Sequence, residues 1–259
     1  MTLNPYSLPN PKDHDRYFTD DITLLPVGII WQSLQGQSIF LRTLFFVYFV
    51  VRKLFRQRMP ASYGTHYPPT LTETTEEHLP DDARQALTAF DHQCQAAGME
   101  HVGYFLPSWI GGKSGVVSIS LDHQRMVWCT ANWLEIRVGQ YGNARVVFAC
   151  HSETADGTEL HTSVETAELW IPQMIPSNVQ IDRIPRGSTV ADIIEHHQTS
   201  VADRTDLVAF DNDSLIAHIQ RRSLELIDFM VSKGFYVELT ADEIDRLRRT
   251  SVGGASQRV

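Results

Sequence analysis

Residues 39–51, IFLRTLFFVYFVV, restrict the possible folds of this chain more than any other segment, because eleven of these thirteen residues are apolar. The segment is followed at once by a cluster of basic residues, in a chain whose formal net charge is −9. The cluster consists of Arg52, Lys53, Arg56 and Arg58. An apolar helix that ends in basic residues is suited to contact a membrane with an anionic surface. The sequence therefore predicts an N-terminal hydrophobic and basic helix.

The length of this helix decides whether it crosses a membrane. A helix over residues 39–51 is about 20 Å long, and one that begins at residue 29 is about 35 Å long but places Arg42 near its middle. Spanning is therefore marginal, and a helix lying in the interface is the alternative. The alternative without membrane contact is a buried helix of a soluble core or of an oligomer interface. The residues expected to contact lipid are Phe40, Leu44, Phe45, Val47, Tyr48, Phe49, Val51, Arg52, Lys53, Arg56 and Arg58.

Composition along the chain predicts five segments. Residues 1–21 are expected to form a flexible arm, residues 22–58 the membrane-associated helix, and residues 59–78 a linker rich in proline and threonine. Residues 79–250 form the main domain, and residues 251–259 a disordered tail. If the helix spans, its basic flank places the main domain in the cytoplasm. Cys94, Cys129 and Cys150 contain no CxxC pair and are expected to be reduced thiols, which agrees with that placement.

The main domain is predicted to have an α+β fold, an antiparallel β-meander packed with helices. A helical pattern covers residues 81–97, and strand-like segments follow at 102–106, 115–121, 125–133, 134–138 and 144–151. Gly98 is expected to end the helix at 81–97. Helical spacing returns at residues 190–201 and 214–232, where Ser188 or Thr189 and Asp211 or Asp213 are candidate N-caps and Gly234 is expected to end the second of these helices. Residues 235–239 form a short strand, and Thr240 and Glu243 form a capping box for a last helix.

The sequence contains eleven histidines, enough to supply the ligands of a metal site. Adjacent residues such as His196 and His197 point about 100° apart on a helix, so both cannot face one ion. His197 lies on the apolar stripe of its helix and is interpreted as a core histidine with satisfied hydrogen bonds. We expect no metal, no cofactor and no catalytic signature. The acidic charge also disfavours binding to nucleic acid.

Asp156-Gly157 between two β-like segments predicts a hairpin with a two-residue turn. Such a turn pairs Ser152 with His161 and places Cys150 and His161 diagonally on one face of the sheet. A thiol and an imidazole in contact form a candidate catalytic or metal-binding pair. Ordinary sheet packing is the alternative.

These observations favour a non-catalytic, membrane-associated protein whose cytoplasmic α+β domain binds a protein or a small ligand. Its expected partners are anionic membrane lipids, through residues 29–58, and a protein. One alternative is an enzyme with a site on the β-meander. The other is a soluble scaffold whose hydrophobic helix belongs to its core or to an oligomer interface.

Overall fold

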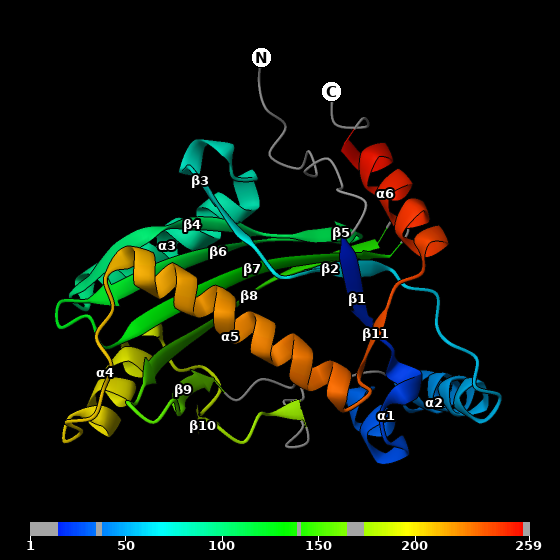
Figure 1. Cartoon of the computed structure of the whole chain (residues 1–259), viewed down its shortest axis with the longest axis horizontal. Coiled ribbons are helices and arrows are strands. Elements are labelled where there is room, and N and C mark those ends of the chain that lie inside the picture. The colour runs from blue at the N-terminus through cyan, green and yellow to red at the C-terminus, as the bar shows by residue number, and fades with distance from the viewer. Residues whose placement is uncertain (1–14, 35–37, 139–140, 165–173, 256–259) are drawn as a thin grey trace.

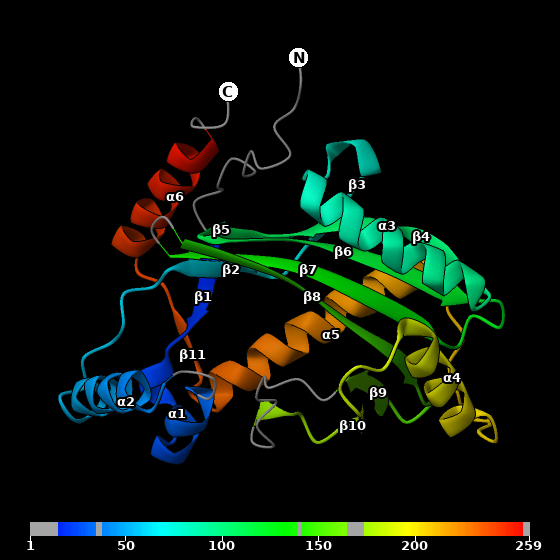
Figure 2. The ribbon, with the colours of Figure 1, turned by 180° about the vertical axis from the view of Figure 1, so that it is seen from behind.

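The computed structural model describes residues 15–34, 38–138, 141–164 and 174–255. The chain folds into a large curved sheet with helices on both faces, a smaller sheet beside it, and a pair of helices that projects from one end (Figures 1 and 2). The prediction of an α+β fold built on a β-meander is confirmed.

The main sheet has the strand order β10-β9-β8-β7-β6-β4-β3. Its strands are β3 (Leu71–Thr74), β4 (Met99–Pro107), β6 (Lys113–Asp122), β7 (Trp128–Val138), β8 (Tyr141–Glu153), β9 (Glu159–Val164) and β10 (Val179–Ile184). Every neighbouring pair is antiparallel except β9 and β10, which run parallel. Short connections between successive strands permit only antiparallel pairing, which is why the close turn signals predict a meander.

Helices cover both faces of this sheet. In Figure 2, α3 (Asp81–Ala96) lies in front of the sheet, and α4 (Val190–Val201) packs near its β9 end. The longest helix, α5 (Asn212–Ser232), crosses the opposite face (Figure 1). Side chains of β7 point alternately to the two faces of the sheet, and each face has its own hydrophobic core. On one face, Cys129, Ala131 and Trp133 pack with α3 and α4. On the other face, Trp128 packs with Leu215 of α5.

Local signals correctly place the ends of these helices. Thr189 caps α4 through the backbone N–H of Asp192, and Asp211 caps α5 through that of Ser214. Gly98 and Gly234 follow the last turns of α3 and α5 with φ of +81° and +71°, a conformation that favours glycine.

The smaller sheet has the order β11-β1-β2-β5 and joins the two ends of the chain. Its strands are β1 (Arg16–Asp20), β2 (Tyr63–Tyr67), β5 (Trp109–Gly111) and β11 (Tyr236–Glu238), and it packs against α6 (Ala241–Ala255). The predicted linker at 59–78 is wrong, because it contains β2, β3 and a 3₁₀ turn, η2 (Glu76–His78). Strand β2 depends on pairing with β1 and β5, which are distant in sequence.

The predicted terminal segments also contain regular structure. Strand β1 lies within the predicted arm, whose residues 1–14 are outside the described part of the chain. Helix α6 extends to Ala255, into the predicted tail, whose residues 256–259 are likewise outside it.

The N-terminal hydrophobic segment forms two helices rather than one continuous helix from residue 29. A 3₁₀ turn, η1 (Ile22–Leu24), leads into α1 (Val27–Ser33) and then α2 (Ile39–Leu54). The rings of Trp31 and Phe46 lie 5.2 Å apart. In a continuous helix, these fifteen positions would separate them by about 22 Å. Helix α1 therefore packs beside α2, and the longer helix considered for a membrane span, which begins at residue 29, is not formed.

Candidate functional site

The outer surface of α2 is the first candidate. None of the 16 residues of α2 is buried. Phe40 and Leu54 are 73% and 75% exposed, values unusual for large apolar side chains. We call the exposed apolar residues of this helix and its C-cap the apolar face: Ile39, Phe40, Leu41, Leu44, Phe45, Val47, Tyr48, Val51, Leu54 and Phe55. Of the other residues expected to contact lipid, Phe49 is half-buried.

The cations at the two ends of α2 point toward the protein. The Arg42 guanidinium donates through Nη2 to the carbonyl of Trp31 at 2.9 Å and lies 3.9 Å from the centre of its ring. Lys53 donates through Nζ to the carbonyls of Thr23 and Leu25 at 2.8 and 3.0 Å. These bonds hold α2 against α1 and η1 by its polar side and leave its apolar face outward.

Two more cations of the basic cluster have protein partners. Arg52 donates to the Tyr48 hydroxyl at 2.6 Å, and Arg58 forms an ion pair with Glu243 at 3.4 Å. Arg56 is exposed at the end of the helix. Thus much of the positive charge predicted to face lipid headgroups is directed at the protein instead. Among the described helices, none combines the length and apolar character needed to cross a membrane.

The β8–β9 hairpin is the second candidate, and its register differs from the expected one by a residue. The structure pairs Cys150 with Thr162 and His151 with His161. Gly157, with φ of +82°, donates its N–H to the carbonyl of Thr154, which extends the loop beyond two residues. A shift of one residue moves each side chain to the other face. Cys150 and His161 therefore lie on opposite faces and do not form the candidate pair.

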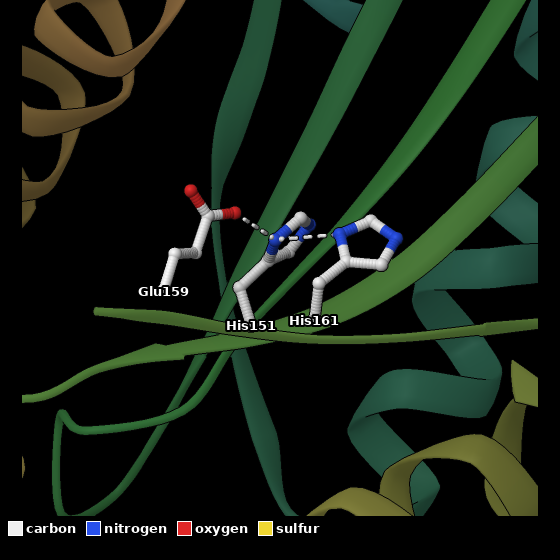
Figure 3. A group of neighbouring side chains, drawn as sticks. All are labelled: His151, Glu159 and His161. Carbon is white, nitrogen blue, oxygen red and sulfur yellow. Dashed lines mark hydrogen bonds and ion pairs between the residues drawn. The ribbon is translucent and has the colours of Figure 1, made fainter. Parts of the chain in front are cut away.

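The actual register brings together His151, Glu159 and His161 on the face crossed by α5 (Figure 3). His151 and His161 are cross-strand partners, and Glu159 precedes His161 by two residues on β9. The Nδ1 of His151 lies 3.0 Å from Oε1 of Glu159 and 3.3 Å from Nδ1 of His161. We call these three residues the His–Glu cluster.

Neighbouring side chains fix the orientation of the His–Glu cluster. Thr130 Oγ1 lies 3.2 Å from Nε2 of His151, and the Trp128 ring stacks on this imidazole with centres 5.4 Å apart. Arg222 of α5 donates through Nε to Oε2 of Glu159 at 3.1 Å. These contacts leave Oε1 of the carboxylate directed at the two histidines, as Figure 3 shows.

The electrostatic environment sets the protonation states of Glu159 and His161. Burial alone favours the neutral form of Glu159, but the hydrogen bond from His151 and the charges of His151, Arg222 and His161 prevail and lower its pKa to about 2. Burial, followed by the charge of His151, lowers the pKa of His161 to about 3. At neutral pH the cluster thus presents a carboxylate and a neutral His161 imidazole.

Two other buried histidines lie beside polar side chains. His197 is fully buried, and its Nε2 and Nδ1 contact the hydroxyls of Ser152 and Thr162 at 2.9 and 2.8 Å. This confirms the interpretation of His197 as a satisfied core histidine. His218 of α5 lies 2.8 Å from the carboxylate of Glu153, so a second acid–imidazole pair joins α5 to the sheet.

All three cysteines are buried and free. Cys129 and Cys150 are cross-strand partners with Sγ atoms 2.6 Å apart, and Cys94 of α3 packs in the same core. Burial raises the pKa of the Cys129 thiol well above its ordinary value. These thiols are packing groups rather than exposed nucleophiles.

Comparisons with protein-family models, curated proteins and solved structures found no match. Function is therefore argued from the geometry of this chain. The His–Glu cluster was not predicted from the sequence, because a two-residue turn places His151 and His161 on opposite faces. With a loop one residue longer, His151, Glu159 and His161 share one face.

Proposed function

We propose that this protein is a peripheral membrane protein that attaches by its apolar face and holds its α+β domain beside the lipid surface. The observation that supports it best is a 16-residue helix with no buried residue and an outward face built from large apolar side chains. Such a helix lies in the interfacial plane, with its apolar side in the boundary between headgroups and acyl chains. The three free cysteines favour a reducing compartment and hence a cytoplasmic leaflet. There the domain would bind a protein or small ligand.

The contacts of α2 favour lipid over a protein partner. Arg42 and Lys53 are bonded to backbone carbonyls of the same chain, so the outward surface consists mainly of hydrocarbon. It extends over about 24 Å, the length of a 16-residue helix. Exposed Arg56 lies at its end, where a cation can reach lipid phosphate. A long apolar strip with a cation at its edge suits an interface between hydrocarbon and headgroups.

Vesicle flotation with the full chain tests this proposal. The variant replaces Phe40, Leu44, Val47 and Leu54 by Ser, and a matched control replaces Val146 and Val231, which are 38% and 37% exposed, by Ser. Transferring Phe40 and Leu54 alone from water into lipid is worth about 1–2 kcal/mol each, so the α2 variant should partition at least about 30-fold less into vesicles. The control should bind as the native protein does.

The lipid composition separates the two contributions to binding. Because Arg42 and Lys53 already have partners, we expect binding to neutral phosphatidylcholine vesicles, strengthened only modestly by phosphatidylserine. Native protein that does not float with either vesicle would refute the proposal. So would a dimer, measured by light scattering, that the Ser substitutions dissociate without any change in flotation.

A further inference from the structure

We propose that His151, Glu159 and His161 form a binding site for one divalent transition-metal ion, with Zn²⁺ as the best match. One ring nitrogen of each histidine and one carboxylate oxygen of Glu159 all lie within 4.8 Å of one another. The short contacts of His151 identify the ligand atoms that we assign as Nδ1 of each histidine and Oε1 of Glu159. The site lies apart from the apolar face of α2, so metal binding and membrane attachment can be tested separately.

The protons available to His151 and His161 cannot give every short contact in the His–Glu cluster a hydrogen bond. Oε1 of Glu159, as a carboxylate oxygen, only accepts hydrogen bonds, so His151 must carry a proton on Nδ1 to donate to it at 3.0 Å. That single proton cannot also point at Nδ1 of His161, 3.3 Å away. If His161 carries the proton instead and donates to His151, the contact between His151 and Glu159 has no proton. A cation between the three atoms would let each of them bind through a lone pair, with no shared proton.

The distances also agree with coordination of one ion. Zinc bonds to imidazole nitrogen and carboxylate oxygen are about 2.0–2.2 Å long, which places neighbouring ligands of a tetrahedral ion about 3.3 Å apart. The contacts of His151 with His161 and Glu159, at 3.3 and 3.0 Å, match this edge length with little movement. Two nitrogens and one oxygen are a donor set suited to zinc, and three protein ligands leave a position for water or a further ligand.

The surrounding residues support this assignment. Thr130 Oγ1, 3.2 Å from Nε2 of His151, can accept the proton that Nε2 carries when Nδ1 binds metal, and such contacts orient ligating histidines. Arg222 holds the other oxygen of Glu159 and so fixes the carboxylate. The side chains of His151 and Glu159 are 13% and 15% exposed, which leaves the ion a path from solvent.

Isothermal titration of the untagged, chelator-treated full chain with Zn²⁺ tests the site. We expect one ion per chain. Loss of a hydrogen-bond partner of a ligand typically weakens metal affinity by about 10–100-fold, so His161→Gln or Glu159→Gln should weaken it by at least about 100-fold. Thr130→Val should weaken it by about 10-fold while leaving all three ligands in place. His196→Gln is the matched control, because His196 is exposed and pairs with Asp182 instead.

Two further measurements keep the outcomes distinct. Circular dichroism of each variant establishes that it is folded, and visible absorption of Co²⁺ substituted for Zn²⁺ reports the number and type of its ligands. The proposal is overturned if the native chain binds no Zn²⁺, or if it binds Zn²⁺ and the folded His161, Glu159 and Thr130 variants bind it as tightly as His196→Gln does. Either result would make the cluster a polar network that joins β8 and β9.

Discussion

Acid should destabilise this protein through His197, and the effect can be worked out from its surroundings. Its imidazole is fully buried and contacts only hydroxyls, those of Ser152 and Thr162, among the polar side chains within hydrogen-bond distance in the described structure. Burial, followed by the charge of His151, lowers its pKa from 6.5 to about 4. The folded chain therefore resists a proton that the unfolded chain accepts readily.

The sign and size follow from this difference. Between pH 6.5 and about 4 the unfolded state binds more protons at this residue, so the free energy of unfolding falls as the pH falls through this window. Each pH unit costs about 1.4 kcal/mol, so the loss attributable to His197 is about 3 kcal/mol. This is a large part of the 5–15 kcal/mol that typically separates folded from unfolded domains. Above pH 6.5 the contribution is fully present.

Urea unfolding followed by tryptophan fluorescence at pH 7.5, 6.5, 5.5 and 4.5 measures the effect. His197→Gln removes the titrating group and retains hydrogen-bonding atoms, so it should be less stable than the native protein at pH 7.5 by about 1–3 kcal/mol. Its free energy of unfolding should then depend less steeply on pH, so that the gap narrows or reverses by pH 4.5. His196→Gln, one residue away and exposed, should keep the native slope. Parallel curves for the native protein and His197→Gln would refute the reasoning.

Three further predictions concern other parts of the fold. Asp91→Ala should lower the free energy of unfolding by about 3 kcal/mol, measured by urea unfolding, because it leaves the buried hydroxyls of Tyr104 and Ser118 without their acceptor. Burial raises the pKa of Asp91, but hydrogen bonds from His101, Ser118 and Tyr104 prevail and lower it. Asp91 therefore contributes to the free energy of unfolding above about pH 4, and this contribution is lost as the pH falls through the lowered pKa. An acid transition of Asp91→Ala identical to that of the native protein would contradict this. Ellman's reagent should detect three thiols per chain in denaturant and react very slowly with the native protein, since each cysteine is at most 1% exposed; rapid native reaction would show that this core opens easily. Gly111→Ala should destabilise the smaller sheet, because φ is +85° and the added Cβ would lie 2.6 Å from the carbonyl of Ser62; an unchanged melting temperature would contradict this.

Signals confined to neighbouring residues predicted much of this fold. Helix ends followed from Thr189, Asp211 and the glycines at 98 and 234, whose effects act within a few residues. The meander followed from closely spaced turns. Strand β2 could not be predicted in this way, because its partners β1 and β5 are about 45 residues away on either side.

The candidate sites depended on details that sequence patterns do not resolve. Asp156 accepts hydrogen bonds from the hydroxyl of Thr154 and the N–H of Thr158 within the β8–β9 loop. This loop is one residue longer than the predicted two-residue turn, and its length decides which side chains of β8 and β9 share a face. The sequence predicted a helix that carries Arg42 and Lys53, but not the direction in which these side chains point. Which carbonyls receive these cations depends on where α1 and η1 pack.

The pairing of β1 with β11 also determines the order in which contacts can form during translation. Phe18 lies opposite Glu238, and Arg16 binds Glu238 at 2.8 Å, so the smaller sheet cannot close until the chain has been made through β11. At about 5–20 residues per second, the ribosome needs about 10–40 s to proceed from α2 to β11. The contacts of Arg42 and Lys53 with nearby carbonyls can form early in that interval, whereas those of Arg58 with Glu238 and Glu243 form last. During translation the apolar helix is thus available to a membrane before the strand that completes its support exists.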